Sequence, residues 1–414
     1  MPPSRGQHGP RRAGQRSARH DRAAGPELSG TNLERAGDHN QRVTLHAIRI
    51  NGPVTRTELA HMTGLTGPSI TNITNRLLKD KMILKAGHAR GSRGQPASRF
   101  VINPDSCYSV GLNIDRDHVT LVVLDFVGGI RARVSREIAF AKPQAVRTLV
   151  QRSIGDMLRK AGIARGRLIG AGIAFPDDLT RTQLPDQPDD YSVWASVRVD
   201  DLIRDVLHIP VFVENDAAAA AIGEMQFGAG QRYRSFFYLL VTAALGGGLV
   251  ADGSYFRGAN GRSGEIGWLH APDYRGRDTQ LQRIVSLSAL YARLSTAGVR
   301  VSSPGELAAL GLESQGVIER WIDEATEALL DSFVAINCLI NPEAILIGGR
   351  LPANLVDQLA ASLNARLAES AAQVPAVAPV ARATMADDAP AVGAAILPFS
   401  DRFLPTRYAL LKSG

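Results

Sequence analysis

The sequence predicts an α/β protein in which a small, mainly helical domain precedes a larger body of two α/β lobes. Three observations support this prediction. Residues 40–102 show helical apolar periodicity followed by a hairpin pattern, buried strands alternate with helices from residue 109 onward, and similar strand hairpins open the two halves of the body. A chain of 414 residues is long enough for two or three domains.

Positive charge is concentrated at the front of the chain. Residues 1–100 contain 17 Lys and Arg against 6 Asp and Glu, whereas the remaining residues contain 30 against 34. This asymmetry favours a front segment that approaches a polyanion, with an ordinary solvated surface as the alternative. Residues 1–37 are rich in Arg, Gly, Pro and Ala, and predict a disordered basic tail.

The sequence predicts a cytoplasmic protein without a cofactor. No apolar run is long enough to span a bilayer, and the first 20 residues lack the apolar stretch of a secretory signal. The two cysteines, Cys107 and Cys338, have no metal-ligand spacing. We therefore expect no membrane contact, no disulfide framework and no thiolate metal site.

Residues 38–103 show a helix, a short helix, a glycine turn and a longer helix, which is the helix-turn-helix order. Thr55 or Thr57 is expected to cap the second helix, which directs Met62 inward, and Thr66 is expected to cap the third. Two short strands at 82–84 and 99–102 then flank a basic turn, as in a wing. A small helical bundle with a polar face is the alternative, and the wing counts against it.

The third helix and the wing carry the candidate DNA contacts. Short hydrogen-bonding side chains and one guanidinium on the outer face of that helix can reach base edges and phosphates in a major groove. These residues are Pro68, Ser69, Thr71, Asn72, Asn75 and Arg76. Arg90 and Arg93 at the wing tip are expected to contact phosphates or the minor groove.

The body divides into a first lobe at residues 104–225, a second lobe at 226–375 and a C-terminal segment at 376–414. The elements expected in the first lobe are strands 109–114, 118–125, 130–135, 168–174 and 211–213 and helices 143–163 and 198–207. In the second lobe we expect a hairpin with Gly246–Gly248 in its turn and helices 278–298, 304–312 and 315–340. A closing helix at 388–398 is expected to return to the first lobe.

A buried strand followed by a helix places Glu214, Asn215 and Asp216 at the strand-to-helix turn, where open α/β sheets bind ligands. A carboxylate beside an amide at a helix N-terminus offers acceptors and donors to adjacent hydroxyl groups. This pair suits a sugar.

The motif order Glu214-Asn215-Asp216, glycine-rich hairpin, then GANGRSGEIG closely resembles the ROK family of sugar kinases and sugar-responsive repressors. The resemblance implies a two-lobed, actin-like fold behind a winged helix-turn-helix. It also implies that Asn215 contacts sugar, that Asp216 matches the catalytic base, and that the loop carrying Asn260 and Glu265 forms part of the site. The family's zinc-binding His is replaced by Trp268, whose indole can stack on a sugar ring, and the family's sugar-binding Glu aligns with Gln282.

Two departures from the family count against catalysis. The phosphate-cradling D-x-G-G-T motif is replaced by residues 113–117, Asn-Ile-Asp-Arg-Asp, and the second phosphate loop at 242–247 has lost half of its glycines. Side chains and carboxylates there would obstruct and repel phosphate. We therefore expect no ATP-dependent enzyme activity, and Asp216 would be a vestigial base. Because Trp268 replaces the family's zinc-binding His, we also expect no zinc.

The sequence thus predicts a cytoplasmic regulator of carbohydrate metabolism, a repressor that binds operator DNA and a sugar-like effector as a homodimer or homotetramer. Population shift would link the two sites: the effector is expected to prefer the closed cleft and DNA the open one, so that lobe closure changes the spacing of two winged helices in an oligomer. One alternative is a carbohydrate kinase with an N-terminal extension. Others are a body that serves only for oligomerisation and a cleft that binds no ligand.

Overall fold

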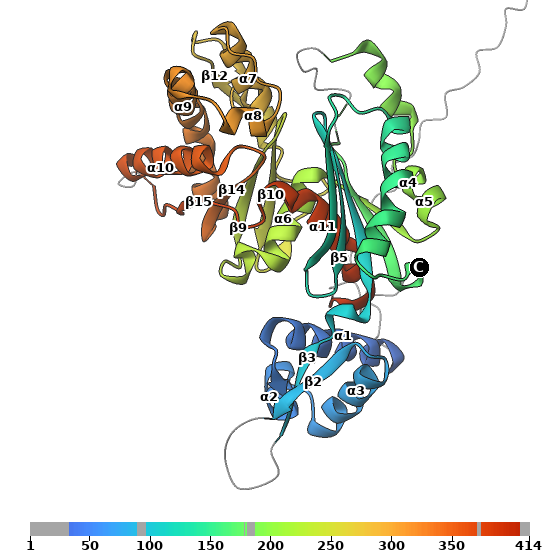
Figure 1. The fold of residues 1–414 in the computed structure, drawn as a ribbon. Coiled ribbons are helices and arrows are strands. Elements are labelled where there is room, and N and C mark those ends of the chain that lie inside the picture. The colour runs from blue at the N-terminus through green and yellow to red at the C-terminus, as the bar shows by residue number, and fades with distance from the viewer. Residues whose placement is uncertain (1–32, 89–96, 178, 180–186, 371–373, 406–414) are drawn as a thin grey trace, which may run out of the picture.

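The computed structural model describes residues 33–88, 97–177, 179, 187–370 and 374–405. Two α/β lobes stand side by side above a small domain formed by the front of the chain (Figure 1). This arrangement confirms the predicted fold class. In the described ranges, no helix has both the length and the apolar character needed to cross a membrane.

The small domain is a winged helix-turn-helix. Its elements are α1 (Leu33–Asn51), β1 (Val54–Thr55), α2 (Arg56–Thr63), α3 (Gly67–Lys79), β2 (Ile83–His88) and β3 (Ser98–Ile102). The strands form an antiparallel sheet in the order β1-β3-β2. The disordered tail predicted over residues 1–37 is too long at its C-terminal end, because α1 already begins at Leu33. Residues 1–32 of that tail lie outside the described residues.

Local hydrogen bonds fix where α2 and α3 begin. The Thr55 hydroxyl accepts from the backbone of Glu58, whose carboxylate accepts from the backbone of Thr55, so Thr55 and not Thr57 is the cap. Thr66 caps α3 as predicted. The prediction that Met62 faces inward is wrong, since 49% of it is exposed. Left-handed Gly64 turns the chain into α3 directly after α2, which leaves the last turn of α2 facing solvent.

The first lobe is built on a five-stranded sheet in the order β6-β5-β4-β7-β8. The strands are β4 (Tyr108–Ile114), β5 (His118–Asp125), β6 (Ile130–Glu137), β7 (Leu168–Ala174) and β8 (Val211–Glu214). Helices α4 (Pro143–Lys160) and α5 (Asp201–Leu207) belong to the same lobe and are shorter than predicted. Every residue of β4 and β5 is buried, because helices cover both faces of this part of the sheet.

The second lobe has a sheet in the order β11-β10-β9-β14-β15 and a separate pair of short strands, β12 and β13. The strands are β9 (Phe236–Val241), β10 (Leu245–Ala251), β11 (Ser254–Tyr255), β12 (His270–Pro272), β13 (Asp278–Gln280), β14 (Ala344–Gly349) and β15 (Val380–Arg382). Its helices are α7 (Leu287–Thr296), α8 (Pro304–Ala308), α9 (Gln315–Ile340) and α10 (Ala353–Ser370).

Several predictions for the second lobe are wrong. Residues 278–280 form strand β13 paired with β12, and the helix predicted over 278–298 is confined to α7. Helix α8 covers only the first half of the predicted 304–312. The lobe does not end near residue 375, because β15 pairs with β14 in its sheet.

The glycines at 246–248 lie in β10 and not in the hairpin turn, which correspondingly falls at 242–244. A side chain on Gly246 or Gly248 would collide with the alanines of the helix that packs on this sheet, and one on Gly247 would meet the backbone of Gly264. The glycines therefore serve close packing and not chain reversal.

Helices α6 (Asp216–Phe227) and α11 (Ala389–Phe403) lie between the two sheets (Figure 1). Helix α6 packs on β10 of the second lobe, whereas α11 returns to β4 and β7 of the first, as predicted for the closing helix. Gly393 of α11 lies against the backbone of Ala219 in α6, where no side chain would fit. The two helices form a closely packed centre shared by both lobes.

The small domain shares a hydrophobic core with the first lobe. Leu45 and Ile48 of α1 and Phe100 of β3 belong to one buried cluster that continues through Phe126 and Phe399 of the body. In addition, Arg42 donates hydrogen bonds to two backbone carbonyls at the end of α11. The small domain is therefore attached through packed surface as well as through the chain.

Candidate functional site

The interlobe pocket lies at the N-terminus of α6. There the turn between β8 and α6 meets the β9–β10 hairpin and the glycine-rich loop at residues 257–265 of the second lobe. Five of the predicted ligand residues line it, and Asn260 does not. The lining predicted from the sequence is Asn215, Asp216, Glu265, Trp268 and Gln282. Sequence reasoning missed Arg116, Asp177 and Arg262, which also line this pocket.

Asn215 and Asp216 are positioned by the first turn of α6. Oδ1 of Asn215 accepts hydrogen bonds from the backbone N–H groups of Ala217 and Ala218, at 2.9 and 3.1 Å, so this amide caps the helix. Only the amide NH₂ of Asn215 is left to donate to a ligand. Burial, together with the charge of Asp115, raises the pKa of Asp216 to about 7. Asp216 can therefore be either a donor or an acceptor near neutral pH.

The remaining lining residues come from the second lobe. Trp268 is 37% exposed, whereas Gln282 is buried and donates a hydrogen bond to Gln280. Glu265 accepts a hydrogen bond of 2.9 Å from Arg262. The pocket has a volume of about 50 Å³, which leaves room for a few water molecules. A monosaccharide would need the lining to move apart.

Ion pairs join the two lobes around this pocket, and each places an arginine on the second lobe against a carboxylate on the first. Arg257 lies 2.5 Å from Glu214, and Arg262 lies 3.9 Å from Asp177. Arg350, which follows β14, lies 2.8 Å from Asp117.

Arg350 also contacts Glu137, and its side chain is only 7% exposed. These interlobe arginines, Arg257, Arg262 and Arg350, connect the two lobes across the cleft.

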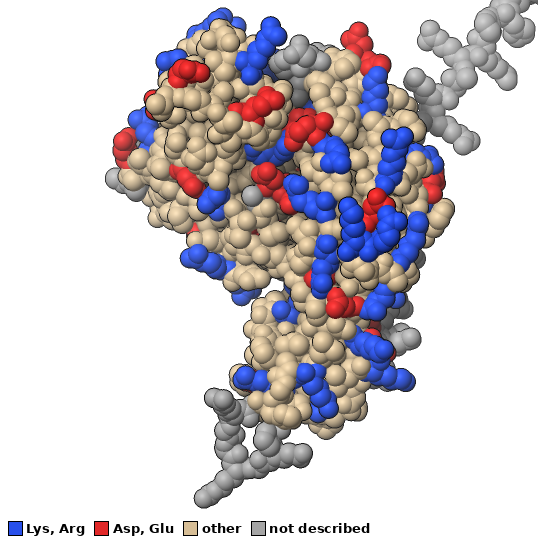
Figure 2. Space-filling view, viewed as in Figure 1, with Lys and Arg blue, Asp and Glu red and all other residues tan. Residues whose placement is uncertain are grey.

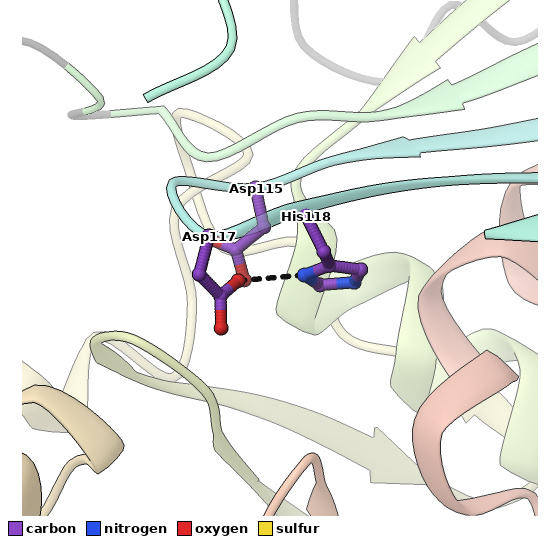
Figure 3. Close-up of side chains that lie close together, drawn as sticks. All are labelled: Asp115, Asp117 and His118. Carbon is purple, nitrogen blue, oxygen red and sulfur yellow. Dashed lines mark hydrogen bonds and ion pairs between the residues drawn. The ribbon is translucent and has the colours of Figure 1, made fainter. Parts of the chain in front are cut away.

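The β4–β5 turn carries a buried polar cluster. The carboxylate of Asp117 contacts Nδ1 of His118 at 2.6 Å, and Asp115 lies beside them (Figure 3). The other ring nitrogen of His118 lies 3.1 Å from the amide of Asn113. Burial raises the pKa of Asp117, but the hydrogen bond from His118 and the charges of His118 and Arg350 outweigh it, so the pKa is lowered.

Neither zinc nor a nucleotide phosphate fits the residues that the resemblance would assign to them. Trp268 offers no metal ligand in place of the family's His. Within the described ranges, one group of three metal-ligating side chains comes together, namely Asp115, Asp117 and His118. Asp117 in this group is already bound by His118 and Arg350. Residues 113–116, at the end of β4 and in the turn after it, are buried, and Asp117 is partly buried, so side chains occupy the place where a phosphate cradle would need bare backbone.

A second cavity of about 830 Å³ adjoins the same turn. Arg116 lines both cavities, and its own side chain is buried. The second cavity extends to α7, the loop after it and α8, where Tyr291, Arg300 and Glu306 respectively contribute to its wall.

The outer face of α3 is the other candidate site. Pro68, Asn72, Asn75 and Arg76 are exposed, and Ser69 and Thr71 are half-buried. Figure 2 shows basic side chains on the visible face of the small domain and hardly any acidic ones. Arg90 and Arg93 at the wing tip lie outside the described residues.

Sequence reasoning did not identify Arg56, at the start of α2, which donates a hydrogen bond of 2.8 Å to Oδ1 of Asn75. The apolar periodicity of α2 and α3 does not predict this hydrogen bond, because the bond joins residues of two different helices.

Comparison with known proteins places these sites in a family context. The profile of the ROK family matches residues 109–400. An uncharacterised protein of Sinorhizobium fredii, y4fQ, is 28% identical over 88% of this chain and 91% of its own. The xylose repressor of Bacillus subtilis is 29% identical over 56% of this chain and 60% of its own.

A crystal structure described as a ROK family transcriptional regulator, a homologue of the Escherichia coli Mlc protein, has the same fold. Its TM-score is 0.65 at 20% identity, with 88% of this chain and 96% of that chain covered. The match includes the winged domain as well as the two lobes, because the body alone is too short to give this coverage. Since the family profile spans well over half of the sequence and the fold agrees, this chain belongs to the ROK family.

Proposed function

We propose that this protein is a transcriptional repressor of carbohydrate metabolism that binds operator DNA through its winged helix domain and a sugar-like effector in the interlobe pocket. The observation that carries the proposal is the combination of two sites in one chain. Exposed polar side chains on α3 lie in a helix-turn-helix, and an amide and a carboxyl group at the start of α6 line a pocket between two lobes. The similarity to proteins named xylose repressor supports both parts.

The effector would act by changing how far the lobes are separated. The pocket as described holds about 50 Å³, so a bound monosaccharide would displace its lining, and we infer that this shifts the population toward a lobe spacing different from the one favoured without effector. The winged domain shares its core with the first lobe and follows that lobe as it moves. In a homodimer or homotetramer this motion changes the distance between two α3 helices, and with it the fit to two operator half-sites.

DNA binding is tested by footprinting the protein on the DNA upstream of its own gene and neighbouring operons, then titrating variants against operator and random duplexes at several salt concentrations. Arg93→Ala should weaken binding to all duplexes and reduce the salt slope by about one. Asn72→Ala should cost about 1–3 kcal/mol on the operator and little on random DNA. Wild-type affinity of both variants for both duplexes would show that this domain does not read DNA.

Effector binding is tested with a panel of pentoses, hexoses and amino sugars, using Trp fluorescence and operator release as readouts. Trp268 lines the pocket and is partly exposed, so a bound sugar ring should change its emission. Trp268→Phe serves as the control, because it keeps an aromatic surface and removes that signal. Release of the operator by a sugar that leaves the fluorescence of both proteins unchanged would place the effector elsewhere.

A further inference from the structure

The guanidinium of Arg56 is held in place by three contacts. Its Nε donates a hydrogen bond to the hydroxyl of buried Thr74 at 2.8 Å, and its Nη2 donates to Oδ1 of Asn75 at 2.8 Å. The guanidinium carbon lies 5.1 Å from the ring centroid of Phe100, which is fully buried. Because Arg56 is the first residue of α2, these contacts join the start of α2 to α3 and β3. The side chain is therefore ordered before any partner binds.

The three contacts leave one edge of the Arg56 guanidinium available. A guanidinium has five N–H donors, and the two that Thr74 and Asn75 engage lie along the edge formed by Nε and Nη2. The edge between the two terminal nitrogens still offers one N–H from each, which is the fork that binds a phosphate through two parallel hydrogen bonds. Nη1 is not buried, and it hydrogen-bonds to no residue in the described ranges.

Arg56 also lacks a carboxylate partner in the part of the chain that the structure describes. The nearest acidic residue along α2 is Glu58, whose carboxylate accepts hydrogen bonds from the backbone and the hydroxyl of Thr55. An anion can therefore bind the free edge of Arg56 without first displacing an ion pair.

The position of Arg56 in the helix-turn-helix places this free edge beside the DNA backbone. In that motif the second helix lies in the major groove, and the helix before it crosses the backbone. Arg56 belongs to the earlier helix, α2, and is bonded to Asn75 on the exposed face of α3. The amide of Asn75 keeps its NH₂ group and a second lone pair on its oxygen, so it can still pair with a base edge.

We propose that Arg56 is a DNA contact that binds one backbone phosphate through the free edge of its guanidinium and sets the position of Asn75 against the bases. Phosphate contacts fix the register and orientation of a protein on a duplex, and base contacts read the sequence. The inference rests on the proposed DNA-binding function and adds a residue of α2 to an interface otherwise assigned to α3 and the wing.

The experiment uses the full-length protein with a footprinted operator and with a random duplex of the same length. Fluorescence anisotropy gives the binding constant for each duplex at several salt concentrations, for the wild type, Arg56→Met, Arg56→Lys and Asn75→Ala. Met keeps apolar contact with Phe100 and removes the charge and every donor, whereas Lys keeps the charge without the fork. Arg159→Met, at an exposed arginine of α4, is the matched control for the loss of one positive charge.

Arg56→Met should weaken binding to both duplexes by about ten- to a hundredfold, the range for a hydrogen bond to a charged group. It should also flatten the dependence of log K on log salt concentration by about one unit of slope, because one phosphate is no longer neutralised. Arg56→Lys should bind both duplexes more weakly than the wild type with an unchanged slope, since the charge is retained. Asn75→Ala should weaken binding to the operator alone, and Arg159→Met should match the wild type on both duplexes.

The inference and the proposed function fail in distinguishable ways. If Arg56→Met keeps the wild-type slope and weakens only the operator, as Asn75→Ala does, Arg56 acts through Asn75 alone, and the inference is overturned while the repressor function stands. The same holds if replacing each operator base pair in turn shows that the loss is confined to one guanine, because Arg56 would then read a base. A wild-type protein that protects no DNA would overturn both.

Loss of folding is separated from loss of the contact by the salt slope. A partly unfolded variant binds less at every salt concentration but keeps the slope of the wild type, and thermal melting measures its folded fraction. Arg56→Gln removes the charge and keeps a donor for Asn75, so it provides the same comparison if Arg56→Met does not fold.

Discussion

Arg49 near the end of α1 donates a hydrogen bond to the side-chain oxygen of Gln226, in the last turn of α6. Its guanidinium also lies over the ring of Phe227, 5.3 Å from the centroid. Helix α6 has 12 residues and is about 18 Å long. Asp216 at its other end lines the interlobe pocket, so a single helix joins the pocket to the winged domain.

We predict that Arg49→Met weakens the coupling between effector and operator. The variant keeps apolar contact with Phe227 but loses the hydrogen bond to Gln226, so movement of α6 is transmitted less well to α1. The measured quantity is the ratio of operator affinities with and without saturating effector, and coupling of this kind is typically about 1–3 kcal/mol. We expect that ratio to approach one while effector affinity stays within about twofold. An unchanged ratio would exclude Arg49 from the coupling.

Arg350→Ala should destabilise the closed cleft. Removing one member of a buried ion pair typically costs about 3–5 kcal/mol. Asp117 keeps its contact with His118 and Glu137 is half exposed, so we expect the lower end of that range. Calorimetry should show a lower Tm, and small-angle scattering a larger radius of gyration. Arg382→Ala removes an exposed ion pair of the same lobe and serves as the control, and an equal effect of the two variants would contradict the prediction.

The raised pKa of Asp216 predicts a specific pH dependence. A carboxyl group whose pKa in the folded state is above its value of about 4 in the unfolded chain contributes most to stability below pH 4. That contribution is lost as the pH rises through the folded-state pKa of about 7. The Asp216→Asn side chain cannot ionise, so the variant does not lose stability as the pH rises. The Tm of the variant minus the Tm of the wild type should therefore increase from pH 5 to pH 8. A difference in Tm that stays constant with pH would show that Asp216 ionises normally.

The purified protein should not phosphorylate pentoses or hexoses with ATP and magnesium. The side chains of Asn113, Asp115 and Arg116 are buried in the turn where phosphate would have to approach the backbone, and Asp115 would repel it. ADP release is measured with each sugar of the panel, and Asp216→Ala sets the background because it lacks the candidate base. Sugar-dependent release well above that background would favour a carbohydrate kinase.

Local signals made much of the fold predictable. Thr66 caps α3 because a hydroxyl before an apolar periodic segment satisfies the first free N–H groups of a helix, and this rule needs no tertiary contact. Asp216 could be placed at the edge of the sheet for a similar reason, since it follows a buried strand and begins a helix, and the structure has it lining the interlobe pocket.

Features that depend on contacts between distant segments were not predictable in this way. Gly247 was assigned to a turn, yet it lies in β10 paired with β9, where the backbone of Gly264 leaves no room for a side chain. Arg350 and Asp117 are 233 residues apart in sequence, and only the placement of both lobes brings them together. Arg56 and Asn75 are closer, but a bond between two helices leaves no trace in the periodicity of either.

The core shared by the winged domain and the first lobe has a consequence for engineering. A chimera that joins residues 38–103 to a different body would leave the buried faces of Leu45 and Ile48 without Phe126 and Phe399, and would expose them to water. The exchangeable module therefore does not end at the covalent linker. It includes the turn after β5 and the last helix of the chain, which a designer would have to transplant together with the DNA reader.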